Sequence, residues 1–151
     1  MLDISSHINK QIFLKTSPKD KLNENNFELK ASKLEHIDNN QVLIEVMYIS
    51  IDAANRAWMQ GRTYRSQILP GDVMGGYALG KVIDSKSNKF KVDDYVEGDL
   101  GWQNYAIRNE NELIKTRIKS SENLHMSVLG ITGKTAYFGL ELANLKAGET
   151  V

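Results

Sequence analysis

Alternating and continuous apolar runs in the first third of the chain predict three β-strands. Residues 10–15 form a short apolar run, and residues 27–34 alternate between apolar and polar side chains, as in a strand with one buried face. Residues 41–51 are the most apolar segment and are rich in β-branched side chains, which favours a central strand covered on both faces. Because only a turn at residues 38–40 separates the second and third runs, we predict that these two strands pair.

More than half of the chain's 11 glycines lie in residues 70–106. There, residues 77–84, 89–100 and 102–107 read as three strands joined by short turns, which is typical of a meander or the edge of a barrel. Residues 112–115 predict one more short strand. The spacing of turns and strands indicates a mainly β domain.

Two helices are predicted outside the strands. Asp52 can cap a short helix over residues 53–60, and Gly61 can end it. Residues 62–69 have no clean periodicity and predict a loop over the mouth of the domain. Near the C-terminus, Ser120 or Ser121 can cap a brief turn through residue 128.

The final third changes to a helical period. Thr132 can cap a helix over residues 133–145 that carries Ala136, Leu140 and Ala143 on one stripe. Lys146 and Gly148 are typical of its end. Strands first and a helix last favour a barrel-like domain that leads into an α/β domain.

The composition excludes several classes of function. Nineteen basic residues balance nineteen acidic ones without blocks of one sign, so no basic surface for nucleic acid or anionic lipid is predicted. The absence of cysteine excludes disulfides, thiolate nucleophiles and cysteine-based metal sites, and it suits a reducing compartment. No apolar run approaches the roughly 20 residues of a membrane span. We therefore expect a cytoplasmic protein without a membrane partner.

The glycine-rich stretch also carries a resemblance to a known family. A glycine pair precedes a strand of small residues, followed by Ser-Lys, Phe-Lys-Val-x-Asp-x-Val and Gly-Asp-x-Gly-Trp-x-x-Tyr-Ala. This pattern resembles the N-terminal, GroES-like domain of the zinc-independent medium-chain dehydrogenase/reductases, in particular the NADP-dependent leukotriene B4 12-hydroxydehydrogenase, or prostaglandin and alkenal reductase, group. Residues 50–56 and 129–151 are further anchors, so the resemblance runs from about Phe27 to Val151.

The resemblance implies a fold and a division of the chain. The expected fold is mainly β with short helices (α+β), a GroES-like, partly open β-barrel over residues 1–128. Residues 129–151 are expected to form a hinge helix and the first residues of a nucleotide-binding domain. In the family, Lys-Ala-Gly-Glu-Thr-Val introduces the first strand of a Rossmann domain. We therefore expect NADP to be bound mainly by residues beyond Val151, and this stretch alone to be inactive.

An oxidoreductase function follows from the same resemblance. The full-length protein is expected to transfer hydride from NADPH to an α,β-unsaturated carbonyl (enone) or quinone, small molecules, without zinc, and the resemblance allows a homodimer. The alternative is a stand-alone GroES-like barrel that serves as a binding or assembly module. The codons that follow Val151 distinguish the two, because a glycine-rich phosphate loop within about a dozen residues would support the enzyme.

No metal site is expected. Zinc-dependent relatives place a cysteine near residues 50–52 and a Gly-His-Glu near Gly75, whereas this chain has no cysteine and has Tyr77 in that neighbourhood. His7, His36 and His125 share no ligand spacing. Each histidine is far more readily explained as a surface or satisfied core residue.

Four residues are candidates for contact with substrate. Zinc-free relatives carry an Asn or Tyr near Asn55, which points to Asn55, or to Ala54 if the alignment slips by one. Relatives read Asp-Pro-Tyr-Met-Arg there, so the loss of the tyrosine weakens any transfer of substrate preference, and a solvated polar pair on a helix is an equal alternative. Tyr64, Tyr77 and Trp102 offer aromatic walls for a planar apolar enone or quinone. Any one of them is more often a core residue, and Trp102 is the favoured candidate.

Thr132 and Thr135 are the candidates for contact with the cofactor. They lie in a segment that corresponds to the family's Gly-Leu-Thr-Ala-Tyr hinge, where backbone and threonine hydroxyl meet the nicotinamide end. Helix N-terminal amides also favour a polar or anionic ligand, although both threonines can simply start a helix. Elsewhere, Asp93 replaces the usual glycine of the family, which predicts a positive φ that aspartate tolerates.

Overall fold

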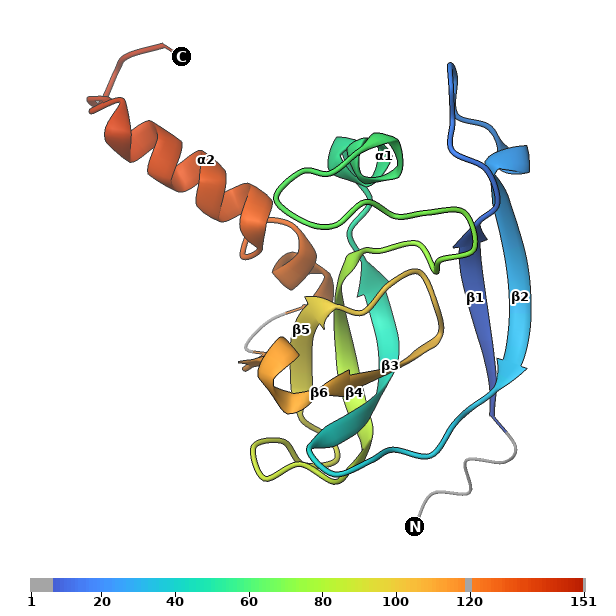
Figure 1. Cartoon of the computed structure of the whole chain (residues 1–151). Coiled ribbons are helices and arrows are strands. Elements are labelled where there is room, and N and C mark those ends of the chain that lie inside the picture. The colour runs from blue at the N-terminus through green and yellow to red at the C-terminus, as the bar shows by residue number, and fades with distance from the viewer. Residues whose placement is uncertain (1–6, 119–120, 151) are drawn as a thin grey trace. The chain divides into compact units, whose positions relative to one another are not determined.

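The main sheet is built around β3 (Gln41–Ile49), the most apolar strand of the chain. The computed structural model describes residues 7–118 and 121–150, and within these the sheet is antiparallel with the order β6-β3-β4-β5-β7. Its other strands are β4 (Tyr77–Ser85), β5 (Tyr95–Asp99), β6 (Tyr105–Asn109) and β7 (Ile114–Thr116). The prediction of a central strand is confirmed, although burial on both faces holds only for Val42, Leu43 and Ile44. Figure 1 shows β3 and β4 at the centre of this sheet.

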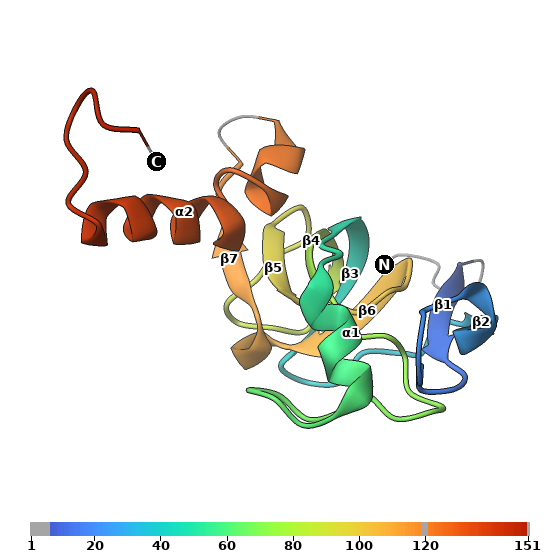
Figure 2. The same cartoon turned by 90° about the horizontal axis from the view of Figure 1, so that it is seen from above.

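A separate two-stranded sheet pairs β1 (Ile8–Leu14) with β2 (Phe27–Lys33). The predicted pairing of β2 with β3 is therefore wrong: β2 takes β1 as its neighbour, with Ile12 opposite Leu29. The expectation that β2 buries one face is also wrong, because six of its seven residues are exposed. Figure 2 shows this pair beside the larger sheet.

The glycine-rich stretch forms only part of the predicted meander. β4 and β5 pair as neighbours through a turn in which Asp93 has φ +74°, so the predicted positive φ is confirmed. The next strand, β6, crosses to the far edge and pairs with β3, so the expectation of three consecutive neighbours is wrong. The short strand predicted near residues 112–115 is confirmed as β7, which pairs with β5.

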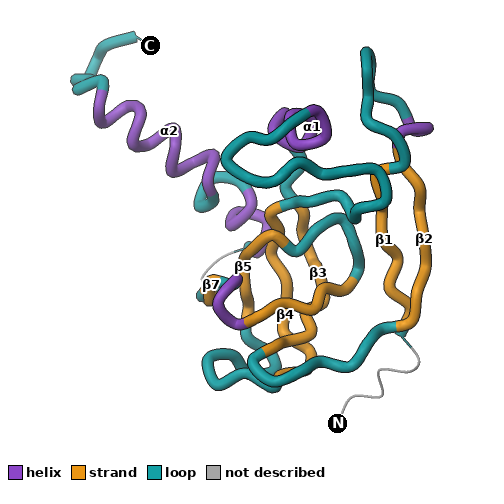
Figure 3. Tube along the Cα trace, viewed as in Figure 1, coloured by secondary structure: helices purple, strands orange, loops and turns teal. Residues whose placement is uncertain are grey.

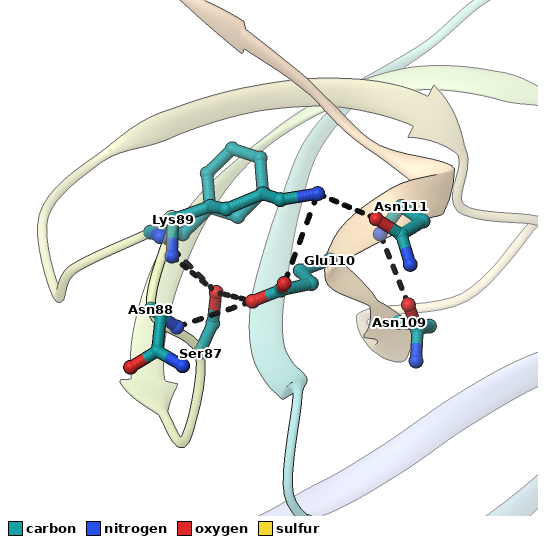
Figure 4. Close-up of polar contacts among 7 residues, drawn as sticks. Ser87, Asn88, Lys89, Asn109, Glu110 and Asn111 are labelled. Carbon is teal, nitrogen blue, oxygen red and sulfur yellow. Dashed lines mark hydrogen bonds and ion pairs between the residues drawn. The ribbon is translucent and has the colours of Figure 1, made fainter.

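The turn after β4 is fixed by a polar network that Figure 4 shows in close-up. The Ser87 hydroxyl donates to Glu110 Oε2 at 2.6 Å, and the Asn88 backbone amide donates to the same oxygen at 3.1 Å. Lys89 Nζ lies 3.7 Å from Glu110 Oε1. The hydrogen bond from Ser87, helped by the Asn88 amide and the Lys89 charge, lowers the pKa of Glu110. Glu110 opens the short 3-10 helix η3 (Glu110–Glu112), so the network ties that helix to the β4–β5 connection.

Two apolar clusters account for most of the core of residues 7–117. One is built mainly on β3, β4 and β5 and includes Val42, Ile44, Val82 and Leu100. The other packs α1 (Ala53–Gln60) against β1 and the loop that follows α1; its buried members are Leu14, Trp58, Met59, Ile68 and Met74. Burial of each such large side chain stabilises the fold by roughly 1.5–3 kcal/mol. The second cluster therefore fixes α1 and its loop.

Helix α1 begins as predicted, at Asp52. The Asp52 carboxylate accepts the Ala54 amide, and the Asn55 side chain accepts the Asp52 amide, which completes a capping box. Gly61 ends the helix in extended backbone. Residues 62–69 form a loop, as predicted, within the long teal connection between α1 and β4 in Figure 3.

Residues 118–151 form the second of two compact units, after residues 1–117. This second unit holds the 3-10 helix η4 (Glu122–Met126) and α2 (Ile131–Leu142). Ser121 stands at the N-cap position of η4, without a side-chain cap bond, and Ser120 lies outside the described residues. The predicted cap of α2 is wrong, because the N-cap is Gly130, two residues earlier, and Thr132 lies inside the helix. Its end is set by Asn144, with φ +53°, ahead of Gly148.

Taken unit by unit, the described chain is mostly β with two α-helices, and its sheets do not close into a barrel. This confirms the predicted mainly β, partly open fold. The stripe predicted on α2 is not buried: none of the helix's described residues is.

Candidate substrate-facing site

Three segments that are distant in sequence meet at one end of the main sheet. β3 ends there and leads into α1, β4 begins there after the Gly75-Gly76 pair, and β5 ends there at Asp99. The antiparallel register places Tyr77 opposite Asp99, and the Ser50 amide donates to the Tyr77 carbonyl at 2.8 Å. We call this region the sheet end.

Asn55 is buried at the sheet end, with 4% of its surface exposed. Its side-chain oxygen accepts the Asp52 amide at 2.7 Å, and its side-chain nitrogen donates to the Gly75 carbonyl at 3.1 Å. These two bonds explain why a polar side chain is tolerated in the core. Asn55 therefore joins the start of α1 to the glycine pair.

Asp99 connects the glycine pair to the loop after α1. Its Oδ1 accepts the Gly76 amide at 2.9 Å, and its Oδ2 lies 2.6 Å from Arg65 Nη1. The Arg65 guanidinium in turn lies over the Trp58 ring, 4.5 Å from its centroid. A Cβ on Gly75 would come within 2.6 Å of the same guanidinium, so the glycine lets Arg65 lie close to the backbone here.

The sequence analysis missed Arg65 and Asp99. Arg65 lies in a loop without periodicity, and Asp99 is one of many acidic residues on strand ends. The glycine pair was the available signal, because adjacent glycines often mark close approach of other groups to the backbone.

Trp102 lies directly against the glycine pair. A Cβ on Gly76 would come within 2.8 Å of the Trp102 ring at Cδ1 and at Nε1. The indole also packs toward Phe27, with ring centroids 5.8 Å apart. The indole Nε1 is buried and has no hydrogen-bond partner. The structure thus brings Trp102 to the sheet end, as part of its wall.

Tyr64 and Tyr77 are placed differently from each other. Tyr64 is 83% exposed and meets Trp58 edge to face, with centroids 6.0 Å apart. Tyr77 is half-buried, and its hydroxyl donates to Glu97 Oε2 at 3.1 Å. Glu97 also accepts the Thr116 hydroxyl at 2.7 Å. The phenol of Tyr77 is thus held by a carboxylate of β5.

Burial, followed by the charge and the hydrogen bond of Glu97, raises the pKa of Tyr77 to about 12. Burial, the Glu97 charge and the hydrogen bond to Glu97 all disfavour the phenolate form of Tyr77. Tyr77 is therefore held as a neutral phenol whose proton is donated to Glu97.

An open, mostly apolar groove of about 330 Å³ adjoins Trp102. Its lining residues are Lys10, Ile12, Leu29, Ile49, Ile51, Trp102, Gln103 and Asn104. A larger, more polar hollow of about 410 Å³ lies near β1 and β6. There the Asn9 amide is already engaged by Gln103 and by the Tyr105 backbone.

Within the second unit, Thr132 and Thr135 are both exposed on α2. The Thr135 hydroxyl donates to the Ile131 carbonyl at 2.8 Å, inside its own helix. Its oxygen keeps lone pairs that can accept a further hydrogen bond. The helix has no side-chain cap at Gly130, and the Gly133 amide of its first turn donates to the Ser127 carbonyl at 3.3 Å.

Among residues 7–118 and 121–150, no three His, Asp or Glu side chains gather closely enough to hold a metal ion. Of the histidines, His7 packs edge to face on Tyr105, with ring centroids 5.6 Å apart, and His125 lies in η4. In the same described residues, no helix is long and apolar enough to cross a membrane.

Comparison with known protein families decides the class of the chain. Residues 10–116 match the family described as the N-terminal domain of oxidoreductase. The chain belongs to this family of oxidoreductase N-terminal domains. The match includes every segment that meets at the sheet end. It confirms the resemblance to the N-terminal domain of the prostaglandin and alkenal reductases.

Individual relatives agree with this assignment. Prostaglandin reductase 1 of Mus musculus is 33% identical over 133 residues, which are 85% of this chain and 39% of that protein. The 2-alkenal reductase (NADP(+)-dependent) of Nicotiana tabacum is 33% identical over 151 residues, 95% of this chain and 44% of the relative. CurA from Vibrio vulnificus, solved in complex with NADPH, superposes with a TM-score of 0.78 at 29% identity over 87% of this chain and 40% of that one. The oxidoreductase N-terminal domain described here thus spans less than half the length of these relatives.

Proposed function

We propose that this chain is the substrate-binding part of an NADPH-dependent reductase that acts on an enone or a quinone. Residues 1–128 form its catalytic domain, and residues 129–151 lead into a nucleotide-binding domain. The observation that carries the proposal is the family match over residues 10–116, because it spans the whole sheet end. Two relatives add support, since they are named as an NADP(+)-dependent 2-alkenal reductase and a prostaglandin reductase.

The described residues fit only one end of the cofactor. Gly75 and Gly76 precede a strand, β4, whereas a dinucleotide phosphate loop connects a strand to a helix. The glycine pair therefore does not fit the role of a pyrophosphate-binding loop. In the second unit, the exposed Thr135 hydroxyl keeps acceptor lone pairs that fit the amide nitrogen of a carboxamide such as that of nicotinamide. We assign Thr132 and Thr135 to that end.

When bound, NADPH supplies the hydride, and the domain supplies the surroundings of the acceptor. Trp102 and Tyr64 provide aromatic surface for a planar, apolar substrate. Asn55 lies beside this surface, where its two side-chain hydrogen bonds hold the Asp52 amide and the Gly75 carbonyl in place. Tyr77, with its raised pKa, contributes a neutral hydroxyl at the start of β4.

The reaction is proposed to proceed without zinc. The side chains that could ligate zinc support this, because the chain has no cysteine and its three histidines share no spacing suited to one tetrahedral site. Negative charge that develops on the substrate carbonyl oxygen must then be stabilised by preorganised hydrogen-bond donors. A homodimer of the full-length protein is part of the same proposal, and light scattering on the purified protein tests it.

The decisive assay uses the product of the complete reading frame that contains this chain. NADPH oxidation is followed with a simple enone, a quinone and the saturated ketone that matches the enone. We expect turnover with the enone or the quinone and none with the saturated ketone. A folded protein that turns over none of the three would favour the alternative, a GroES-like binding module.

A further inference from the structure

The apolar groove beside Trp102 is lined in part by large, exposed apolar side chains. Leu29 is 66% exposed and Ile51 is 71% exposed, so two large apolar side chains face solvent at one place. Isolated exposed apolar residues are ordinary, whereas several that line one hollow form a candidate binding surface. The partly buried Ile12 and Trp102 complete the apolar part of the lining.

Backbone hydrogen bonds show which lining residues lie side by side at each end of the groove. The Ile12 amide donates to the Trp102 carbonyl at 2.9 Å, and the Asn104 amide donates to the Lys10 carbonyl at 3.0 Å. These two bonds are successive rungs between β1 and the segment before β6. Lys10 and Ile12 share one face of β1, because side chains alternate along a strand. The groove thus runs from an apolar level, at Ile12 and Trp102, to a polar level at Lys10 and Asn104.

The polar level carries a positive charge. Lys10 and Asn104 are both exposed, and no acidic side chain is among the residues that line the groove. Gln103, the remaining polar residue of the lining, is held in place: its side chain donates to the Leu100 carbonyl at 2.6 Å and accepts from Gln11 at 2.7 Å. The available charged partner for a ligand is therefore the Lys10 ammonium.

We propose that this groove is a binding site for a medium-chain carboxylate, with its alkyl chain between Leu29, Ile51 and Trp102 and its carboxylate at Lys10. The volume of about 330 Å³ lies at the small end of the range for ligand pockets and suits a single chain of moderate length. The chemistry is complementary at both ends, apolar against apolar and anion against cation. The site does not require the proposed reductase activity.

Titration of the purified protein with decanoate tests this site, with tryptophan fluorescence and calorimetry as readouts. Decanoate should saturate with a Kd of about 1 mM or tighter, the scale expected for a ligand of about 12 heavy atoms. Acetate, which has the charge without the chain, should not saturate. Decanol, which has the chain without the charge, should bind more weakly than decanoate.

Two variants and a matched control assign the binding to this groove. Ile51→Glu places a carboxylate among the apolar walls and should weaken decanoate binding at least ten-fold. Lys10→Gln should weaken decanoate several-fold and leave decanol unchanged. Val92→Glu, at a position 53% exposed in the β4–β5 turn, should change neither.

Absence of saturation by decanoate overturns the proposal, and so does a Kd that Ile51→Glu leaves unchanged. NADPH turnover is measured separately, so a protein that binds decanoate and reduces nothing would refute the reductase alone. A protein that reduces enones and ignores decanoate would refute the groove alone.

Discussion

The guanidinium of Arg65 and the carboxylate of Asp99 form an ion pair, with Nη1 and Oδ2 2.6 Å apart, that joins the loop after α1 to the end of β5. The same carboxylate accepts the Gly76 amide. One acidic side chain thus fixes both the glycine pair and the loop that borders the sheet end.

Replacement of Asp99 by alanine should loosen this end of the sheet. The ion pair itself is worth at most about 1 kcal/mol, since its two side chains are 28% and 46% exposed. The loss of the acceptor for the Gly76 amide adds to this, and we expect the free energy of unfolding to fall by roughly 1–2 kcal/mol in all. Limited proteolysis should show faster cleavage within residues 62–69.

Two further variants control this experiment. Asp99→Asn keeps an oxygen for the Gly76 amide and should recover part of the stability. Glu28→Ala removes an ion pair with Lys30 whose side chains are both 49% exposed, and it should have little effect. Equal loss in Asp99→Ala and Glu28→Ala would contradict the role given to Asp99.

Substitution of Gly76 tests the close approach of Trp102. In Gly76→Ala the new Cβ would lie 2.8 Å from the indole, which must shift, so we expect a loss of roughly 1–3 kcal/mol in unfolding free energy. Tryptophan fluorescence should change as well. Gly61→Ala is the matched control, because nothing lies within 4 Å of its Cβ and its φ is −178°. A Gly76→Ala protein as stable as Gly61→Ala would show that the indole is not held there.

Tyr77 should make stability depend on pH in the alkaline range. Its pKa rises from 10.0 to about 12 on folding, so the neutral phenol is favoured in the folded state. This contribution is fully present below pH 10 and is lost as the pH rises from 10 to 12. Tyrosinate absorbance should show one late-titrating tyrosine among the six.

The late titration step should disappear in Tyr77→Phe and persist in Tyr64→Phe. Glu97→Gln removes the second cause of the shift, so the Tyr77 pKa should fall yet stay above its ordinary value because burial remains. A late step that survives in Tyr77→Phe would assign it to another residue.

Local chemistry made several features predictable from the sequence. Asp52 could be identified as a helix cap, because the side chain that stabilises a helix start lies beside it in sequence. Asp93 could be given a positive φ, because the family that the chain resembles usually has glycine there and aspartate tolerates that backbone conformation. In both cases the deciding interaction spans a few residues.

Long-range pairing was less accessible. Apolar and polar residues alternate along β2 as in a half-buried strand, yet β2 pairs with β1 and stays exposed. The alternation does not determine which strand pairs with it or what covers its apolar face. Thr132 was assigned as the helix cap on its residue type, whereas α2 starts at Gly130. Trp102 was identified as a candidate, but its packing on Gly76 and the link from Arg65 to Asp99 depend on three segments that meet only in the fold.

Thr135 carries the sharpest prediction for the second unit. In the full-length protein, Thr135→Val keeps the side-chain shape and removes the oxygen that we assign to the nicotinamide end. A lost hydrogen bond of about 1–3 kcal/mol corresponds to a roughly ten- to hundred-fold fall in kcat/KM. Thr135→Ser, which keeps the oxygen, should restore most of the activity. An unchanged kcat/KM in a folded Thr135→Val protein would remove this residue from the site.

The fate of the transferred hydrogen tests the central claim most directly. The full-length protein, freed of metal by chelation and checked by elemental analysis, is given an enone and NADPH that carries deuterium at the transferable position of the nicotinamide. We predict the same turnover as for the untreated protein with the same deuterated cofactor, and a saturated carbonyl product with deuterium on the carbon β to the carbonyl. Deuterium on the carbonyl carbon of an alcohol product, or activity that returns only with zinc, would contradict a zinc-free enone reductase.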